Sequence, residues 1–113
     1  MDVQITNRTV GEVTVLDVVG RLGMNRSSGA LRDAVRQALA DGAKNVLINM
    51  TLVTHMDSSG IAELVSGYTM AVGSQASLKL AGLSRRLANI LDITGLGRIL
   101  EVHDNERSAI SSF

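Results

Sequence analysis

The sequence predicts an α/β domain built on a mixed, mostly parallel sheet of four to five strands, with three to four helices. Stretches with strand patterns alternate with stretches of helical spacing, which is typical of parallel strands joined by helical crossovers. The continuous apolar run Val46-Leu47-Ile48 indicates a strand buried on both faces. Two earlier runs rich in β-branched residues predict an antiparallel strand pair at the N-terminal end.

This antiparallel pair is expected to open the chain. Its first strand covers about residues 3–10 and its second about residues 13–19. Gly11-Glu12 lies between them and is typical of a hairpin turn, so the two strands are expected to be neighbours. Asp17 is the only charged residue of the second strand.

Two helices are expected before and after the central strand. The first covers about residues 27–41, with Asn25, Ser27 and Ser28 as possible N-caps and Gly42 at its end. The second begins after the central strand and ends near Gly73. The apolar residues at helical spacing are Leu31, Ala34, Val35, Ala38 and Leu39 in the first helix, and Ile61, Leu64, Val65, Tyr68 and Val72 in the second.

The last third of the chain predicts two more strands and one or two helices. A strand is expected over residues 77–81, a helix over residues 83–94 and a short last strand over residues 99–102. Residues 104–111 predict a terminal helical turn or a short helix. The positions expected to face inward are Leu78 and Leu80 in the strand, and Leu87, Ile90 and Leu91 in the helix.

The composition excludes several classes of protein. The 113 residues fit one domain, here residues 1–113, and eleven basic residues balance eleven acidic ones. This balance argues against a general nucleic-acid binder, which needs a basic surplus. The absence of cysteine excludes disulfides and thiolate metal sites. Without a bilayer-length apolar run or a signal peptide, a cytoplasmic protein with no membrane span is expected.

The motif Met56-Asp57-Ser58-Ser59-Gly60 is the most informative stretch of the chain. It lies at the carboxyl end of the central strand, where α/β sheets gather their functional loops. Its two hydroxyls stand at or just before a helix N-terminus, whose free N–H groups and partial positive charge suit a phosphate. Ser58 or Ser59 is therefore either a phosphoryl acceptor or only an N-cap, a position that serine favours.

The two histidines indicate no catalytic or metal centre. His55 precedes Asp57 and Ser58, which suggests a hydrolase triad, but triad members normally meet from separate segments. The motif also differs from the Gly-x-Ser-x-Gly elbow of α/β-hydrolases. We expect His55 to pack or hydrogen-bond beside the turn. His55 and His103 without cysteine form no coherent metal site, and no metal or cofactor is expected.

The order of elements and the strand–Met-Asp-Ser-Ser-Gly–helix junction resemble the STAS domain, specifically the bacterial anti-sigma factor antagonists. The resemblance covers nearly the whole chain. It rests on Gly20-Arg21-Leu22 after the second strand, the apolar strand at Val46, residues 56–61, and the segment from Gly82-Leu83-Ser84 to Thr94-Gly95-Leu96.

The resemblance implies a partner-switching protein that is a substrate and not an enzyme. In that family the first serine of the motif, here Ser58, is phosphorylated by an anti-sigma factor that is also a serine kinase. The unphosphorylated antagonist binds this anti-sigma factor and releases the sigma factor, and a Ser/Thr phosphatase reverses the modification. ATP and Mg²⁺ then belong to the kinase. The chain is expected to be a monomer or weak dimer that does not bind nucleic acid directly.

The expected partner surface joins two segments. One is the turn, with Ser58 as acceptor; Asp57 either meets a partner's donor or stabilises the turn, and Ser59 is expected to be the N-cap. Gly60 either admits a partner's backbone or only forms a tight turn. The other segment consists of Gly23, Met24, Asn25 and Arg26. Many antagonists have aspartate where this chain has Gly23 and Asn49, so this second segment is expected to differ from the family pattern.

Two functions from different classes remain open. The first is the phosphorylation-gated interaction module. The second is a non-phosphorylated scaffold subunit of the same fold, in a stress-signalling or lipid-transport complex. A hydrolase is a distant third. An intact phosphoacceptor at Ser58 favours the first.

Overall fold

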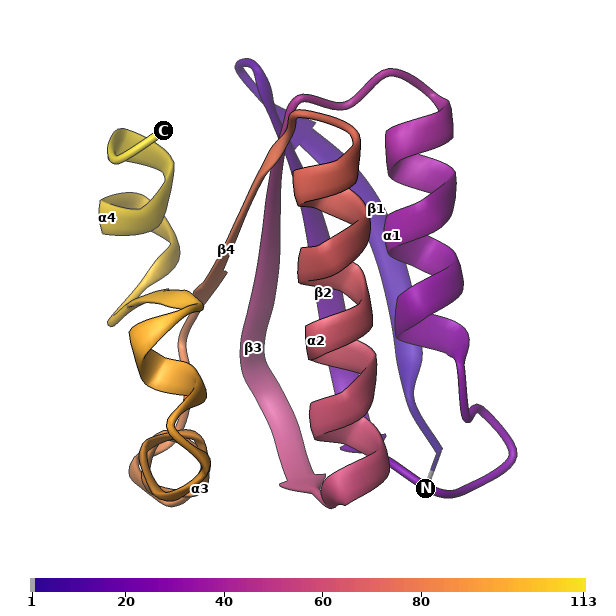
Figure 1. The fold of residues 1–113 in the computed structure, drawn as a ribbon, viewed down its shortest axis with the longest axis vertical. Coiled ribbons are helices and arrows are strands. Elements are labelled where there is room, and N and C mark those ends of the chain that lie inside the picture. Colours follow the sequence, from indigo (N-terminus) through magenta and orange to yellow (C-terminus); the bar gives the residue numbers. More distant parts are fainter. Residues whose placement is uncertain (1) are drawn as a thin grey trace.

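The computed structural model describes residues 2–113, and in them five strands form one mixed sheet in the order β1-β2-β3-β4-β5 (Figure 1). β1 and β2 are antiparallel, and every other neighbouring pair is parallel, so the predicted sheet is confirmed. The strands are β1 (Gln4–Val10), β2 (Val13–Leu22), β3 (Asn45–Met56), β4 (Ser77–Ala81) and β5 (Glu101–His103).

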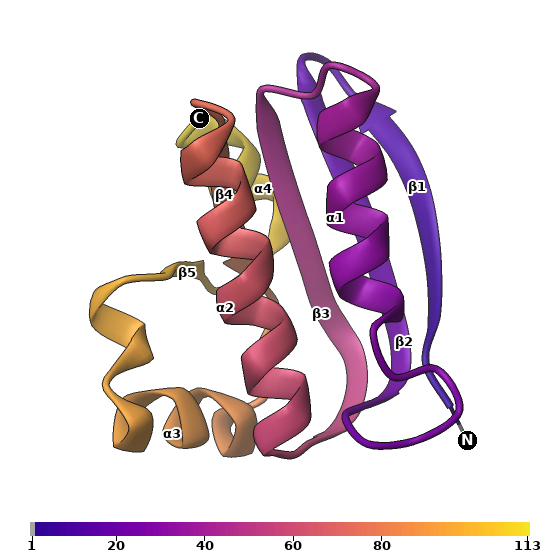
Figure 2. The ribbon, with the colours of Figure 1, turned by 45° about the vertical axis from the view of Figure 1, so that its right-hand side comes forward.

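The helices cover the two faces of the sheet unequally. α1 (Ala30–Ala40) and α2 (Ser58–Gly73) lie side by side over one face, and α4 (Glu106–Ser111) packs against the other (Figure 2). α3 (Arg85–Thr94) lies near the start of α2, and a short 3₁₀ turn, η1 (Leu96–Arg98), leads from it to β5.

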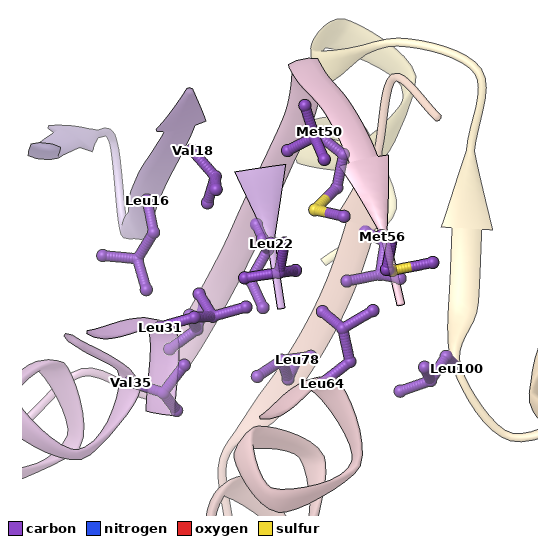
Figure 3. Close-up of a cluster of buried hydrophobic side chains, with 14 of the residues drawn as sticks. Leu16, Val18, Leu22, Leu31, Val35, Met50, Met56, Leu64, Leu78 and Leu100 are labelled. Atoms are coloured by element: carbon purple, nitrogen blue, oxygen red, sulfur yellow. The ribbon is translucent and has the colours of Figure 1, made fainter. Parts of the chain in front are cut away.

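The larger core lies between the sheet and the helices α1, α2 and α3. Figure 3 shows side chains of β2, α1 and α2 together in this layer, among them Leu22, Leu31 and Leu64. The smaller core, around Leu47 and Ala109, lies under α4. Val46, Leu47 and Ile48 are all fully buried, which confirms that the central strand β3 is covered on both faces.

Several predicted boundaries need correction. β2 and β3 are longer than predicted because they continue to pair through two register shifts, as far as Leu22 and Met56. The last strand begins at Glu101 because η1 and the residues after it occupy the predicted start. α3 begins at Arg85, capped by Ser84, whose Oγ accepts the N–H of Leu87 at 3.2 Å.

The predicted inward stripe of α2 is wrong at two positions. Val65 and Val72 are 38% and 56% exposed. The buried positions of this helix are Gly60, Glu63, Leu64, Gly67 and Ala71. Small residues let α2 approach its neighbours closely, and hydropathy patterns do not mark them as inward.

The start of α1 also differs from the prediction. Its N-cap is Gly29, in the left-handed region with φ of 90°, and no neighbouring side chain caps the helix. Asn25, a predicted cap, instead stabilises the preceding loop: its Oδ1 accepts the N–H of Ser27 at 2.8 Å. The first N–H groups of α1 donate to Glu63 of α2.

Candidate functional site

The site is the turn between β3 and α2, which we call the serine turn (residues 56–60). Met56 ends β3 and is buried, whereas Ser58 is exposed as the first residue of α2. The N-cap is Asp57, in an extended conformation, so the prediction that Ser59 caps the helix is wrong. A carboxylate accepts the orphan N–H groups at a helix start as well as a hydroxyl does, and this leaves the Ser58 hydroxyl outside the cap.

Asp57 joins the serine turn to the loop before α1, which we call the α1 loop (residues 23–29). Its Oδ1 accepts the N–H of Gly60 at 3.1 Å, and its Oδ2 accepts the N–H of Met24 at 3.0 Å. These bonds, the Met24 bond foremost, lower the pKa of the Asp57 carboxyl, because they favour the charged form. The turn-stabilising role foreseen for Asp57 is therefore present, and it brings the two predicted segments together.

Two glycines permit this arrangement. A Cβ at Gly23 would overlap the carboxylate of Asp57, so in this chain the glycine makes room for the carboxylate that binds the loop. A Cβ at Gly60 would overlap the backbone carbonyl of Leu22. Gly60 is buried against its own chain, so of the two roles foreseen for it the structure contains the tight turn.

The α1 loop presents its two largest side chains, those of Met24 and Arg26, to solvent. Met24 is 76% exposed and Arg26 is also exposed. Asn25 is half-buried, and its side-chain amide donates to the carbonyl of Arg21 at 3.0 Å. Asn25 thus builds the loop, while Met24 and Arg26 form its outer surface next to the serine turn.

The outer face of α2 is a feature that the sequence analysis missed. Glu63 is the only charged residue of α2, and it is buried. The exposed stripe that continues from Ser58 therefore carries no charge; it consists of Ala62, Val65, Thr69 and Val72. The absence of Asp, Lys and Arg over these 16 residues could have revealed it.

A hollow of about 330 Å³ opens beside the serine turn, at the carboxyl ends of β2 and β3. Its lining includes Arg21, His55 and Arg86. The Nδ1 of His55 lies 3.0 Å from the Thr54 hydroxyl, and within residues 2–113 no hydrogen bond joins this ring to Ser58 or Asp57. His55 therefore hydrogen-bonds beside the turn as predicted, and a triad is not assembled.

Two features are absent from residues 2–113. Across residues 2–113 no group of three or more His, Asp or Glu side chains is placed to hold a metal ion. No helix in the same span is long and apolar enough to cross a membrane.

The comparisons with known proteins agree with this architecture. The family model of the STAS domain matches residues 4–109. The chain belongs to the STAS domain family. The anti-sigma-B factor antagonist of Bacillus subtilis (strain 168) is 38% identical over 64 residues, which cover 57% of this chain and 59% of that protein. The matched region thus spans about three-fifths of this relative's length.

Solved structures share the fold of this STAS domain. An anti-sigma factor antagonist from Mycobacterium paratuberculosis has a TM-score of 0.88 at 19% identity, covering 98% of this chain and 93% of that one. The Bacillus cell fate determinant SpoIIAA in its phosphorylated form has a TM-score of 0.73 at 21% identity, covering 96% and 98%. At these identities the likeness shows the fold alone.

Proposed function

We propose that this STAS domain is an anti-sigma factor antagonist that works as a phosphorylation-gated partner switch. The unphosphorylated form binds an anti-sigma factor that is also a serine kinase, and this binding releases a sigma factor. Phosphorylation of Ser58 ends the complex, and a Ser/Thr phosphatase restores it. The kinase supplies ATP and Mg²⁺.

The observation that carries the proposal is the position of Ser58. Its hydroxyl is exposed and free of the cap, at one end of the uncharged face of α2 and beside the outer surface of the α1 loop. An uncharged face is well suited to be buried by a partner, because no charge has to be desolvated. The name of the Bacillus subtilis relative supports the part of the proposal that concerns an anti-sigma factor antagonist, and SpoIIAA shows that this fold occurs in a phosphorylated form.

Phosphorylation would change this surface sharply. A phosphate adds roughly −1.5 to −2 charges at neutral pH, and here it would stand one residue from the ionised Asp57. In a closely packed interface the two charges repel and remain unpaired, so the partner should leave. The free domain should keep its fold, because the start of α2 favours a negative charge.

Binding measurements on three variants test the gate. Ser58→Glu should weaken binding of the anti-sigma factor kinase from the same organism by about 10- to 100-fold, or roughly 1–3 kcal/mol, because an unpaired charge is desolvated. Ser58→Ala should bind like the wild type. Ser111→Glu, an exposed change in α4, controls for the added charge.

The same kinase with ATP should add one phosphate, located on Ser58 by mass spectrometry. A phosphate on Ser59 with Ser58 untouched contradicts the assignment. Equal affinities of Ser58→Glu and Ser58→Ala contradict the gate. They favour the alternative hypothesis, a non-phosphorylated scaffold of the same fold.

A further inference from the structure

Glu63 is a buried carboxylate on the helix that begins with the phosphoacceptor. It is 5% exposed and is the only buried polar or charged side chain in the described part of the chain. Its Oε2 is enclosed and has no hydrogen-bond partner among residues 2–113. An apolar side chain would avoid the cost of burying this charge, so core packing alone does not explain a glutamate here.

The other oxygen of Glu63 caps a different helix. Oε1 accepts the backbone N–H of Leu31 at 3.0 Å and that of Arg32 at 3.3 Å, both in the first turn of α1. A helix start needs such acceptors, and a side chain just before the helix usually provides them. Gly29 stands at that position in α1 and has no side chain to offer. The cap of α1 therefore comes from α2.

This cap is the polar connection between the two helices. Within residues 2–113, the two bonds to Glu63 are the only hydrogen bonds that join α1 to α2. Elsewhere the helices meet through close packing, as at Gly67, where an added Cβ would lie 3.3 Å from a methyl group of Val35. A crevice of about 230 Å³ lies between them, lined in part by Ser28 and Ser59.

Glu63 and Asp57 together hold both ends of the α1 loop. Asp57, one residue before Ser58, binds the N–H of Met24 at the start of the loop. Glu63, five residues after Ser58, binds the helix that follows the loop. The loop therefore cannot shift relative to the phosphoacceptor without breaking a bond to one of these carboxylates.

We propose that Glu63 is a positioning residue for partner binding: it fixes the α1 loop in the place where Met24 and Arg26 form one surface with Ser58. The proposal rests on the proposed function. It assigns Glu63 no direct contact with the partner, because the side chain is buried.

Three variants separate positioning from general stability. Glu63→Met keeps the volume and the helix propensity but removes the acceptor. Glu63→Gln keeps an acceptor oxygen and should rescue the cap. Asn105→Ala is the matched control, because it removes the N-cap of α4 on the opposite face of the sheet. In the wild type, Oδ1 of Asn105 accepts the N–H of Ser108 at 2.9 Å.

Two measurements are made on each variant: amide hydrogen exchange by NMR, and affinity for the anti-sigma factor kinase by calorimetry. Glu63→Met should speed exchange at Leu31 and Arg32 by about tenfold or more, and weaken binding by about tenfold. Glu63→Gln should stay within about twofold of wild type in both. Asn105→Ala should lower the melting temperature and leave both unchanged.

Unchanged exchange at Leu31 and Arg32 in Glu63→Met would contradict the assignment of Glu63 as the cap of α1. Faster exchange with wild-type affinity would overturn the positioning role. If Glu63→Met does not fold, the Glu63→Gln protein decides, since loss of affinity in that variant contradicts rescue by the remaining acceptor. If the wild-type protein binds no such kinase, the proposed function fails. The exchange data alone then show whether Glu63 caps α1.

Discussion

The surfaces around α2 and around α4, on opposite faces of the sheet, use charge differently. Around α2, the carboxylates of Asp57 and Glu63 bind backbone N–H groups. On the face covered by α4, exposed charges pair with one another, as between Arg8 and Asp17 with Nε–Oδ2 of 2.6 Å. We call these the α2 face and the α4 face.

The α4 face uses its ion pairs to attach the end of the chain. Arg8 of β1 bonds to Asp17 of β2 and, with Nη1–Oε2 of 3.1 Å, to Glu106 of α4. Asn49 of β3, where many antagonists have aspartate, donates to Asp17 at 2.8 Å. This difference from the family pattern therefore lies on the α4 face, away from the serine turn. A surface committed to such pairs is poorly suited to a partner, whereas the exposed stripe of α2 carries no charge.

The largest expected effect comes from closing the space beside the serine turn. Gly60→Ala should lower the free energy of unfolding by roughly 3 kcal/mol, because the new Cβ meets the Leu22 carbonyl and the backbone has to shift. Gly73→Ala, at the other end of α2 where nothing lies within 4 Å, is the matched control. It should gain up to about 1 kcal/mol from helix propensity. Denaturant titrations measure the free energy of unfolding of both variants. Equal effects would contradict the close approach of Gly60 to the Leu22 carbonyl.

The sequence predicted the parts of the fold that apolar spacing determines. The bounds of β4 follow from its alternation, and the buried face of α1 follows from Leu31, Val35 and Ala38. The motif also placed Ser58 at the start of a helix. It did not reveal that Asp57 is the cap, because aspartate and serine both favour that position.

The parts that were mispredicted depend on contacts between distant segments. The inward side of α2 contains Gly60, Glu63 and Gly67, which a hydropathy pattern assigns to the surface. Their burial depends on the close approach of Leu22 and Val35, and on the N–H groups of α1. No local pattern encodes such an approach, so the link between the two halves of the proposed partner surface had to come from the structure.

The next effect tests the ion pairs of the α4 face. Arg8→Met should destabilise the protein by about 1 kcal/mol, since it leaves Asp17 and Glu106 without their cation at a surface where solvent screens the pairs. The loss should shrink in 1 M salt. Affinity for the anti-sigma factor kinase should not change. A loss of binding that exceeds the loss of stability would mean that the α4 face also contacts the partner.

A smaller effect appears as pH falls. Hydrogen bonds from His103, and then from Lys79, lower the pKa of Glu101 from 4.5 to about 2. A carboxylate with a depressed pKa contributes stability that is present above pH 4.5 and lost as pH falls toward 2. Because Glu101 is exposed, the contribution should stay below about 1 kcal/mol. Thermal melts of Glu101→Gln should show a shallower fall in stability over that pH range than the wild type, and identical slopes would contradict the pairing.

The smallest effect on stability should accompany a large effect on binding. Val65→Lys places a charge in the middle of the uncharged stripe of α2, at a position that is 38% exposed and can hold a lysine in water. The free energy of unfolding should change by less than about 0.5 kcal/mol. Binding of the anti-sigma factor kinase should weaken by about tenfold or more, because the interface would bury the charge without a partner. Ile93→Lys, in α3 and 86% exposed, is the control and should bind like the wild type.

If both variants bind normally, the uncharged stripe is not part of the interface. The gate at Ser58 would then act only through the serine turn and the α1 loop.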